Sequence, residues 1–269
     1  MPTICAAMLE LDNRDTFQGM NSKSYDAFDD AVQRADALFN AHAPANAIRI
    51  FMAPEYSFSD HQVSSSGAVN IGSFSSGDKM GLYKKLQATS SRYADIVIVA
   101  GTIAYKKGVF SKSHLAVCPI LWNGQFLLKY YKQSFDGFQI GASNTSFERK
   151  NNGSTFIHQG VNFGIEVCSD HGVHKTLRGA LGANATVDVH LLVSEGMAPS
   201  ALAICARPGG LMVNCDMSGR ASAGNGIRTV GVNKFGNNSV DMKSTGRVAE
   251  SSGLTLGSGA HVVLYSGAF

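Results

Sequence analysis

Three apolar, β-prone segments in the first part of the chain, separated by two segments with helical spacing, restrict the fold more than any other feature of the sequence. The apolar segments are residues 3–9 (TICAAML), 47–53 (AIRIFMA) and 95–105 (DIVIVAGTIAY), and their composition is typical of buried strands. Between them, residues 23–42 and 79–94 repeat apolar side chains at the spacing of an amphipathic helix. This order of strands and helices predicts an α/β fold.

The rest of the chain adds strands and one short helix to this pattern. Asn123–Gly124 between SHLAVCPILW and QFLLKYYK is a strong signal for a β-hairpin. Further expected elements are a short helix at 174–183 and strands at 161–167, 188–194, 226–232 and 261–265. Because no linker, repeat or charge block marks a boundary, residues 1–269 are expected to form a single α/β sandwich domain.

The composition excludes several classes of protein. Of 269 residues, 44% are hydrophobic and 16% charged, with a net charge of +3, which indicates a compact globular protein that requires neither nucleic acid nor a membrane as partner. The sequence predicts no secretory signal and no transmembrane helix. The five cysteines have no CxxC spacing, which favours reduced thiols and a cytoplasmic location; they are Cys5, Cys118, Cys168, Cys205 and Cys215.

Three polar residues stand directly after apolar strands. Glu55 follows RIFMAP, Lys132 closes FLLKYYK, and Cys168 closes FGIEV. Loops at strand ends are where open α/β sheets carry their chemistry. Attack of a thiol on an amide or nitrile carbon needs a base and a cation or N–H donor, and these residue types supply both. Each residue alone has a more ordinary interpretation, as a core cysteine, a solvated lysine or half of a surface ion pair.

The order and spacing of these residues resemble the nitrilase superfamily of carbon–nitrogen hydrolases. The matching motifs are APEY around Glu55, NGQFLLKYYK ending at Lys132, and GIEVCSD around Cys168. Lys132 lies 77 residues after Glu55, and Cys168 lies 36 residues after Lys132, both similar to the family pattern. The similarity extends from residue 3 to around residue 220. Its last part includes DVHLLVSEG and ARPGGLMVNCDMSG, which follow the cysteine.

The resemblance implies a four-layer αββα sandwich and hydrolysis of a small amide, carbamoyl compound or nitrile through a thioester intermediate. It implies Glu55 as the base, Cys168 as the nucleophile, and Lys132 with the backbone N–H of Ser169 as stabilisers of the oxyanion. It further implies an amidase-like member that needs no cofactor or metal and assembles into homodimers or larger homo-oligomers.

This chain departs from the family pattern at several positions. Ser169 stands where the family often has an aromatic residue, KQSF follows Lys132 in place of His-Leu, and Asp216 stands where an Asn is usual. The second glutamate of the family, which would orient Lys132, is expected at Glu148, with Asp136 as the alternative. These departures concern the substrate class more than the reaction type.

Candidates for substrate contacts are Tyr56, Glu195 and Asp216. If Glu195 and Asp216 open on the same rim as the base and the nucleophile, two extra carboxylates would favour a substrate with an amine or guanidinium. In the alternative, Glu195 caps a helix or meets Arg207 or Arg220, and Asp216 bonds to backbone N–H groups.

Residues 56–78 are rich in Ser, Gly and Asn and directly follow the expected base. The composition predicts a loop. Such a loop either covers the mouth of the pocket or is an ordinary surface insertion.

Other functions remain open at this stage. A papain-like hydrolase would pair Cys168 with His158 or His190, and a hydrolase resembling isochorismatase would use an early acid such as Asp12. A metal site would use ligands from one short segment, namely Cys168, Asp170, His171 and His174. A catalytically silent relative that only binds a small molecule or a partner protein would keep the fold without the reaction.

Overall fold

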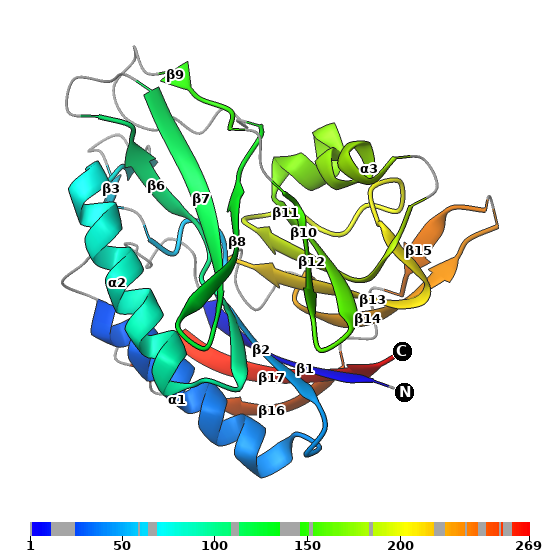
Figure 1. Cartoon of the computed structure of the whole chain (residues 1–269). Helices are drawn as coiled ribbons and strands as arrows, with labels where there is room; N and C mark the ends of the chain where they lie inside the picture. Colours follow the sequence, from blue (N-terminus) through cyan, green and yellow to red (C-terminus); the bar gives the residue numbers. More distant parts are fainter. Residues whose placement is uncertain are drawn as a thin grey trace.

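The computed structural model describes residues 2–11, 25–58, 60–63, 69–108, 113–134, 146–150, 153–182, 185–217, 224–234, 236–241, 246–252, 254 and 260–269. These residues form two large sheets with helices on their outer faces (Figure 1). The helices are α1 (Tyr25–His42), α2 (Ser76–Arg92) and α3 (Thr176–Leu181), with a π-helical turn, η2 (Asp170–His174), before α3. In this described part of the chain, no helix is long and apolar enough to cross a membrane.

The first sheet has nine strands, of which three central ones are parallel. Its order is β16 (Arg247–Ser251), β17 (Ala260–Ala268), β1 (Thr3–Leu11), β2 (Ile48–Met52), β5 (Ile96–Val99), β7 (Ser113–Trp122) and β6 (Ile103–Lys106), and β8 (Gln125–Tyr131) and β9 (Ser146–Phe147) also pair with β7. The parallel strands are β1, β2 and β5. Their carboxyl ends therefore meet at one edge, and Glu55 follows the end of β2 at that edge.

The second sheet has six strands and repeats this arrangement. Its order is β10 (Thr155–His158), β11 (Val161–Val167), β12 (Val187–Ser194), β13 (Ala206–Asp216), β14 (Gly226–Val232) and β15 (Asn238–Val240). Strands β11, β12 and β13 are parallel, with Val167 opposite Val193 and Val193 opposite Cys215. This register brings the residues after β11, β12 and β13 to the same end of the sheet.

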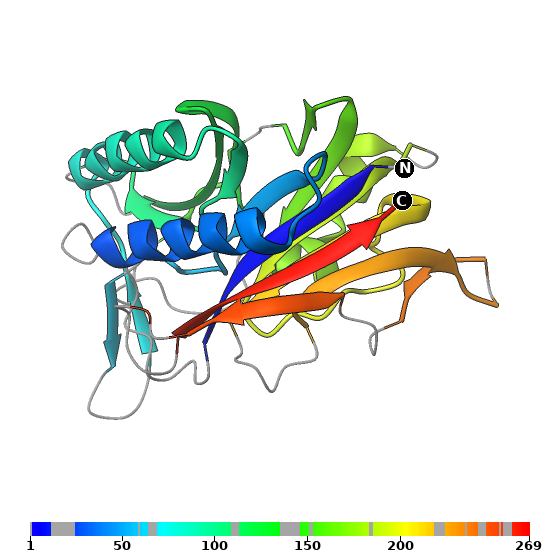
Figure 2. The same ribbon diagram turned by 90° about the horizontal axis from the view of Figure 1, so that it is seen from below.

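The apolar side chains define four layers. A core of inward-facing residues, such as Ile50 of the first sheet and Ile165 of the second, lies between the two sheets. Helices α1 and α2 pack on the outer face of the first sheet (Figure 2), where Phe28 and Leu86 are completely buried. The short α3 covers the outer face of the second sheet through Leu177. The order helix, sheet, sheet, helix is an αββα sandwich.

The segment 56–78 is more regular than the sequence predicts. It contains a small hairpin of β3 (Asp60–Val63) and β4 (Val69–Gly72), and α2 begins at Ser76 rather than at residue 79. The hydroxyl of Ser75 accepts a hydrogen bond from the Asp78 N–H, and the Asp78 carboxylate accepts one from the Ser75 N–H. This capping box is a start signal that the serine-rich composition concealed.

Candidate active site

Glu55, Lys132 and Cys168 come together between the two sheets. Glu55 follows β2 after Pro54, Lys132 directly follows β8, and Cys168 directly follows β11. Their exposed fractions are 0%, 3% and 5%, respectively. These three residues are far apart in the sequence, and in the structure all three are almost completely shielded from solvent.

Lys132 and Glu55 form a buried ion pair. The Lys132 Nζ lies 2.6 Å from Glu55 Oε1. The same ammonium group lies 5.6 Å from the centre of the Tyr56 ring, close enough for a cation–π contact. Tyr56 has a left-handed φ of 56°, and its N–H donates to the Thr102 hydroxyl at 2.8 Å. The turn after β2 thus supplies both the carboxylate and an aromatic face to the lysine.

Two contacts fix the position of the Glu55 turn. The Glu55 N–H donates to the carbonyl of Ser194 at 3.4 Å, which connects the first sheet to the end of β12 in the second. Gly101 has a φ of 74°, and a Cβ at this position would lie 2.3 Å from the Pro54 carbonyl oxygen. Only glycine allows so close an approach, so this position supports the placement of the base.

Cys168 occupies a strained turn. Its φ of 48° is left-handed, a conformation that costs a non-glycine residue about 1–2 kcal/mol. Hydrogen bonds hold it there: its N–H donates to Val193 O at 2.9 Å, and its thiol donates to Glu195 O at 3.7 Å. Strain that the surroundings enforce is concentrated at functional sites, and this strain is at the predicted nucleophile.

The electrostatics of the site keep the resting thiol protonated. Burial raises the pKa of Cys168, the charge of Glu55 raises it further, and the charge of Lys132 lowers it. A hydrogen bond to the Glu55 side chain also stabilises the thiol form. Glu55 is therefore the carboxylate whose negative charge acts on the thiol.

Asp170 connects the lysine segment to the cysteine turn. Its carboxylate is completely buried and accepts hydrogen bonds from the Tyr130 hydroxyl at 2.6 Å, the Gln133 N–H at 2.9 Å and the Ser134 N–H at 2.7 Å. The Ser134 and Ser169 hydroxyls are a further 2.8 Å apart. The residues on either side of Lys132 are thereby tied to the residues that follow Cys168.

A second buried carboxylate, Glu166, supports the same turn from the other side. Its Oε2 lies 2.7 Å from His171 Nδ1 and 3.2 Å from His190 Nε2. Its Oε1 accepts the Leu177 N–H at 2.7 Å and the Thr176 hydroxyl at 3.1 Å. Glu166 was not predicted as a site residue; the available signal was a single charged residue inside the apolar strand VNFGIEV.

The two histidines around Glu166 have defined tautomers. His171 Nε2 accepts the Ser200 N–H at 2.9 Å, and His190 Nδ1 accepts the Cys205 N–H at 3.2 Å. His171 therefore donates its Nδ1–H to Glu166, and the Nε2–H of His190 faces the same carboxylate oxygen at 3.2 Å. Glu166, His171 and His190 have the spacing of a metal site, but these hydrogen bonds use the ring lone pairs that a metal would need. The cluster positions η2 and α3.

Acid is expected to destabilise the protein through this cluster. Burial alone would raise the pKa of Glu166, but the hydrogen bonds from His171 and His190 outweigh it and lower the pKa from 4.5 to about 2. Unfolding below pH 4.5 therefore takes up a proton, and stability worth on the order of 3 kcal/mol is lost as the pH falls from 4.5 towards 2. Urea denaturation at a series of pH values measures the free energy of unfolding. In Glu166→Gln this free energy should decrease less as the pH falls. The same pH dependence of the free energy of unfolding in wild type and in Glu166→Gln would contradict this prediction.

Glu148 does not lie beside Lys132 as the sequence suggested. Its carboxylate pairs with Lys107 at 2.6 Å, where the two side chains are 33% and 62% exposed. Its backbone N–H donates to His114 O on the neighbouring strand. The alternative acid, Asp136, lies outside the described residues, as do Asp12 and Arg220.

The predicted substrate contacts have mixed placements. Strands β12 and β13 are neighbours, as expected, and end beside Glu195 and at Asp216. Asp216 is 2% exposed and accepts the Gly196 N–H at 2.9 Å, which matches the alternative in which it bonds to the backbone. Arg207 pairs with Asp188 at 2.8 Å.

The described residues do not assemble the Cys–His pair or the metal site considered as alternatives. His158 packs against Trp122, with ring centres 5.0 Å apart, and His190 belongs to the Glu166 cluster. Asp170 and His171 are bound to protein donors and acceptors, and His174 is exposed. No group of potential metal ligands in the described part of the chain includes Cys168.

Comparison with known proteins gives a match in structure only. No protein-family model matches the chain, and no curated protein matches its sequence. An amidase from Nesterenkonia sp. matches with a TM-score of 0.57 and 14% identity, covering 98% of this chain and 89% of that one. Nit3 of Saccharomyces cerevisiae, a member of branch 10 of the nitrilase superfamily, matches with a TM-score of 0.51 and 12% identity over the same shares. The chain therefore has the αββα fold of the nitrilase superfamily, as its sequence motifs implied.

Proposed function

We propose that this chain hydrolyses a non-peptide C–N bond of a small amide, carbamoyl compound or nitrile through a thioester on Cys168. The observation that carries the proposal is the Lys132–Glu55 ion pair, 2.6 Å apart and almost fully buried, beside a cysteine in a left-handed turn. Burying two charges costs several kcal/mol per ion before their attraction is counted. Covalent thiol catalysis requires a base and a cation near a thiol, and the charges of Glu55 and Lys132 both act on Cys168.

The reaction follows from the positions of these groups. For an amide, Glu55 accepts the thiol proton, the sulfur bonds to the carbonyl carbon, and the carbonyl oxygen takes up the negative charge. The C–N bond then breaks, and Glu55 returns the proton to the leaving ammonia or amine. Water, deprotonated by Glu55, attacks the thioester, and the thiol leaves with that proton. For a nitrile, the sulfur and its proton add across the carbon–nitrogen triple bond to give a thioimidate; water then adds to the same carbon, and loss of ammonia gives the same thioester.

Charge stabilisation comes from Lys132 and from the backbone N–H of Ser169. Each oxyanion donor is typically worth about 3–4 kcal/mol of transition-state stabilisation. Asp170 and the Glu166 cluster do not act on the substrate themselves. They hold in place the segments that carry Lys132 and Ser169.

The structural neighbours support an amidase-like reaction. One variant of the Nesterenkonia sp. AN1 amidase carries the acetamide moiety of fluoroacetamide covalently on its active-site cysteine, and a second variant of it is in complex with butyramide. Those observations belong to that protein. The expected homodimer or larger assembly and the cytoplasmic location belong to this proposal and rest on the sequence resemblance.

Tyr56 has the best-supported role among the predicted substrate contacts, because its ring flanks the Lys132 ammonium. Glu195 supplies a carbonyl to the Cys168 thiol, so its backbone already belongs to the site. Asp216 supports the loop at Gly196. A preference for a cationic substrate would rest on the side chain of Glu195.

The function is tested with a panel of short amides, ureas and nitriles of matched chain length, scored by ammonia release. Mass spectrometry of the protein quenched during turnover should find an acyl adduct on the peptide that contains Cys168. Ammonia release without this adduct would contradict the thioester. Absence of both across the panel would favour the catalytically silent alternative.

A further inference from the structure

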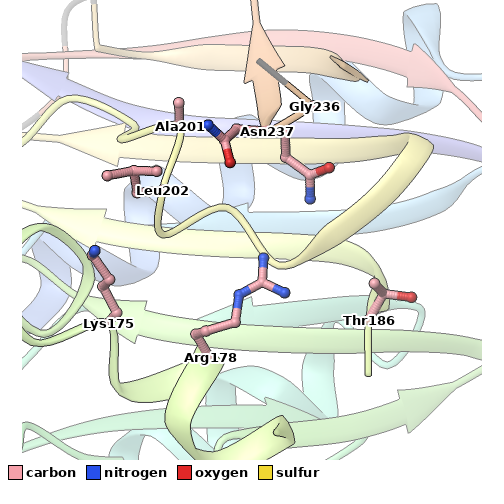
Figure 3. A pocket seen from close by; sticks show the side chains of 8 residues that line it. Lys175, Arg178, Thr186, Ala201, Leu202, Gly236 and Asn237 are labelled. Carbon is pink, nitrogen blue, oxygen red and sulfur yellow. The ribbon is translucent and has the colours of Figure 1, made fainter. Parts of the chain in front are cut away.

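A second site lies on the outer face of the second sheet, away from the catalytic residues. It is a cavity of about 510 Å³ lined by α3, the start of β12, the segment before β13, and the turn that precedes β15; its lining residues are Lys175, Arg178, Thr186, Ala201, Leu202, Gly236, Asn237 and Asn238. Figure 3 shows Lys175 and Arg178 on one side of this outer cavity, with Ala201, Leu202 and Asn237 across from them.

The outer cavity is separated from the active site by the sheet itself. Leu177 and Ile204 beneath it belong to the apolar cluster on the outer face of the sheet, whereas Cys168 belongs to the core between the two sheets. Thr186 adjoins the amino end of β12, and the Ser194 carbonyl that contacts Glu55 is at the opposite end of that strand. A ligand in the outer cavity would not be the one that reacts with Cys168.

The charge of the outer cavity is unbalanced. Neither Lys175 nor Arg178 has a carboxylate partner among the residues that the structure describes, and none of the described residues that line the cavity is acidic. Lys175 directly precedes α3 and Arg178 lies within it, so two positive charges line the same cavity and favour an anion.

The donors of the outer cavity are also held in place. Arg178 donates to the Ile204 carbonyl at 2.6 Å, which fixes the guanidinium and leaves further N–H groups for a ligand. Asn238 donates to the same carbonyl at 3.0 Å, from the turn opposite. The side chains of Thr186 and Asn237 make no hydrogen bond with other described residues, and both line the cavity. Two cations, a hydroxyl and an amide therefore line one cavity.

We propose that the outer cavity binds a small organic molecule bearing a carboxylate or phosphate group. Its volume lies within the range of small-molecule sites, roughly 300–1,000 Å³, and exceeds what a single inorganic ion would fill. Lys175, Arg178 and Asn237 hold the anionic group, and Leu202 and Ala201 contact the remainder of the ligand. This site is independent of the reaction at Cys168.

Calorimetric titration of the full chain tests the proposal. Glycerol 3-phosphate and citrate are compared with uncharged glycerol at constant ionic strength, so that only the anionic group differs between the two glycerol compounds. We expect saturable binding of at least one anion and none of glycerol. Tighter binding of glycerol 3-phosphate identifies a phosphate ligand, and tighter binding of citrate a carboxylate ligand.

Three variants assign the binding to the outer cavity. Lys175→Gln should weaken the affinity about tenfold or more, as expected for loss of a charge-assisted hydrogen bond. Asn237→Ala, which keeps the charge, should also weaken it. Lys84→Gln removes the same charge from an exposed position on α2 and should leave the affinity unchanged. Absence of anion binding to the wild type, or equal affinity in wild type and Lys175→Gln, would overturn the proposal.

Discussion

Replacing Cys168 with alanine is expected to lower ammonia release on the best substrate by at least about a thousandfold. In the proposed mechanism the sulfur is the atom that bonds to the substrate carbon, and neither Glu55 nor Lys132 can take its place. The measurement is the steady-state rate, together with alkylation by a small thiol reagent. Wild type should take up one label at Cys168, because the other four cysteines are 0–1% exposed, and the variant should take up none. Near wild-type turnover by Cys168→Ala would show that the mechanism is wrong.

Cys168→Gly separates this loss of chemistry from any loss of structure. Glycine adopts a φ of 48° without strain, so this variant loses the nucleophile and relieves the turn at the same time. We expect it to be as inactive as Cys168→Ala and to have a Tm at least as high. An inactive but stable glycine variant assigns the loss to the missing sulfur.

The placement of the three candidate residues could be predicted because each one follows a strand that the sequence pattern indicates. Glu55, Lys132 and Cys168 follow apolar segments whose order indicates parallel and hairpin strands. The structure brings them together at the expected edge. The structure differs from the prediction in the segment 56–78, which the abundance of serine and glycine predicted as a loop. The capping box at Ser75, which starts α2, was the less apparent signal.

The supporting residues could not be predicted in the same way. Glu166 and His190 are neighbours only because β11 and β12 pair, and His171 reaches them only because the chain turns through η2. Asp170 stood in the Cys-x-Asp motif, but its bonds to Gln133 and Ser134 depend on how the two sheets face each other. Glu148 was expected beside Lys132 from the family pattern, whereas its partner in the structure is Lys107 at the surface. Which side chains become hydrogen-bond or ion-pair partners depends on the tertiary structure, and the pattern of strands in the sequence does not determine it.

Replacing Lys132 with methionine is expected to destabilise the protein by about 3–5 kcal/mol and to abolish turnover. Methionine keeps much of the length and apolar volume of the lysine chain but removes its charge, so the completely buried Glu55 carboxylate loses its ammonium partner. The free energy of unfolding is measured by urea denaturation. Lys107→Met is the matched control, because its Nζ also lies 2.6 Å from a carboxylate, that of Glu148, but at the surface. Exposed pairs are worth about 0–1 kcal/mol, so this control should remain close to wild type.

The double variant Lys132→Met with Glu55→Gln distinguishes a pair kept for stability from a pair kept for chemistry. Removing both charges eliminates the uncompensated carboxylate, so the double variant should regain stability relative to Lys132→Met alone. It should remain as inactive as either single variant, because base and oxyanion stabiliser are both gone. Recovered stability without recovered turnover would mean that folding does not require these charges and that catalysis does. If the double variant were as unstable as Lys132→Met, the ion pair itself would be a structural requirement, and its burial would no longer argue for a catalytic site.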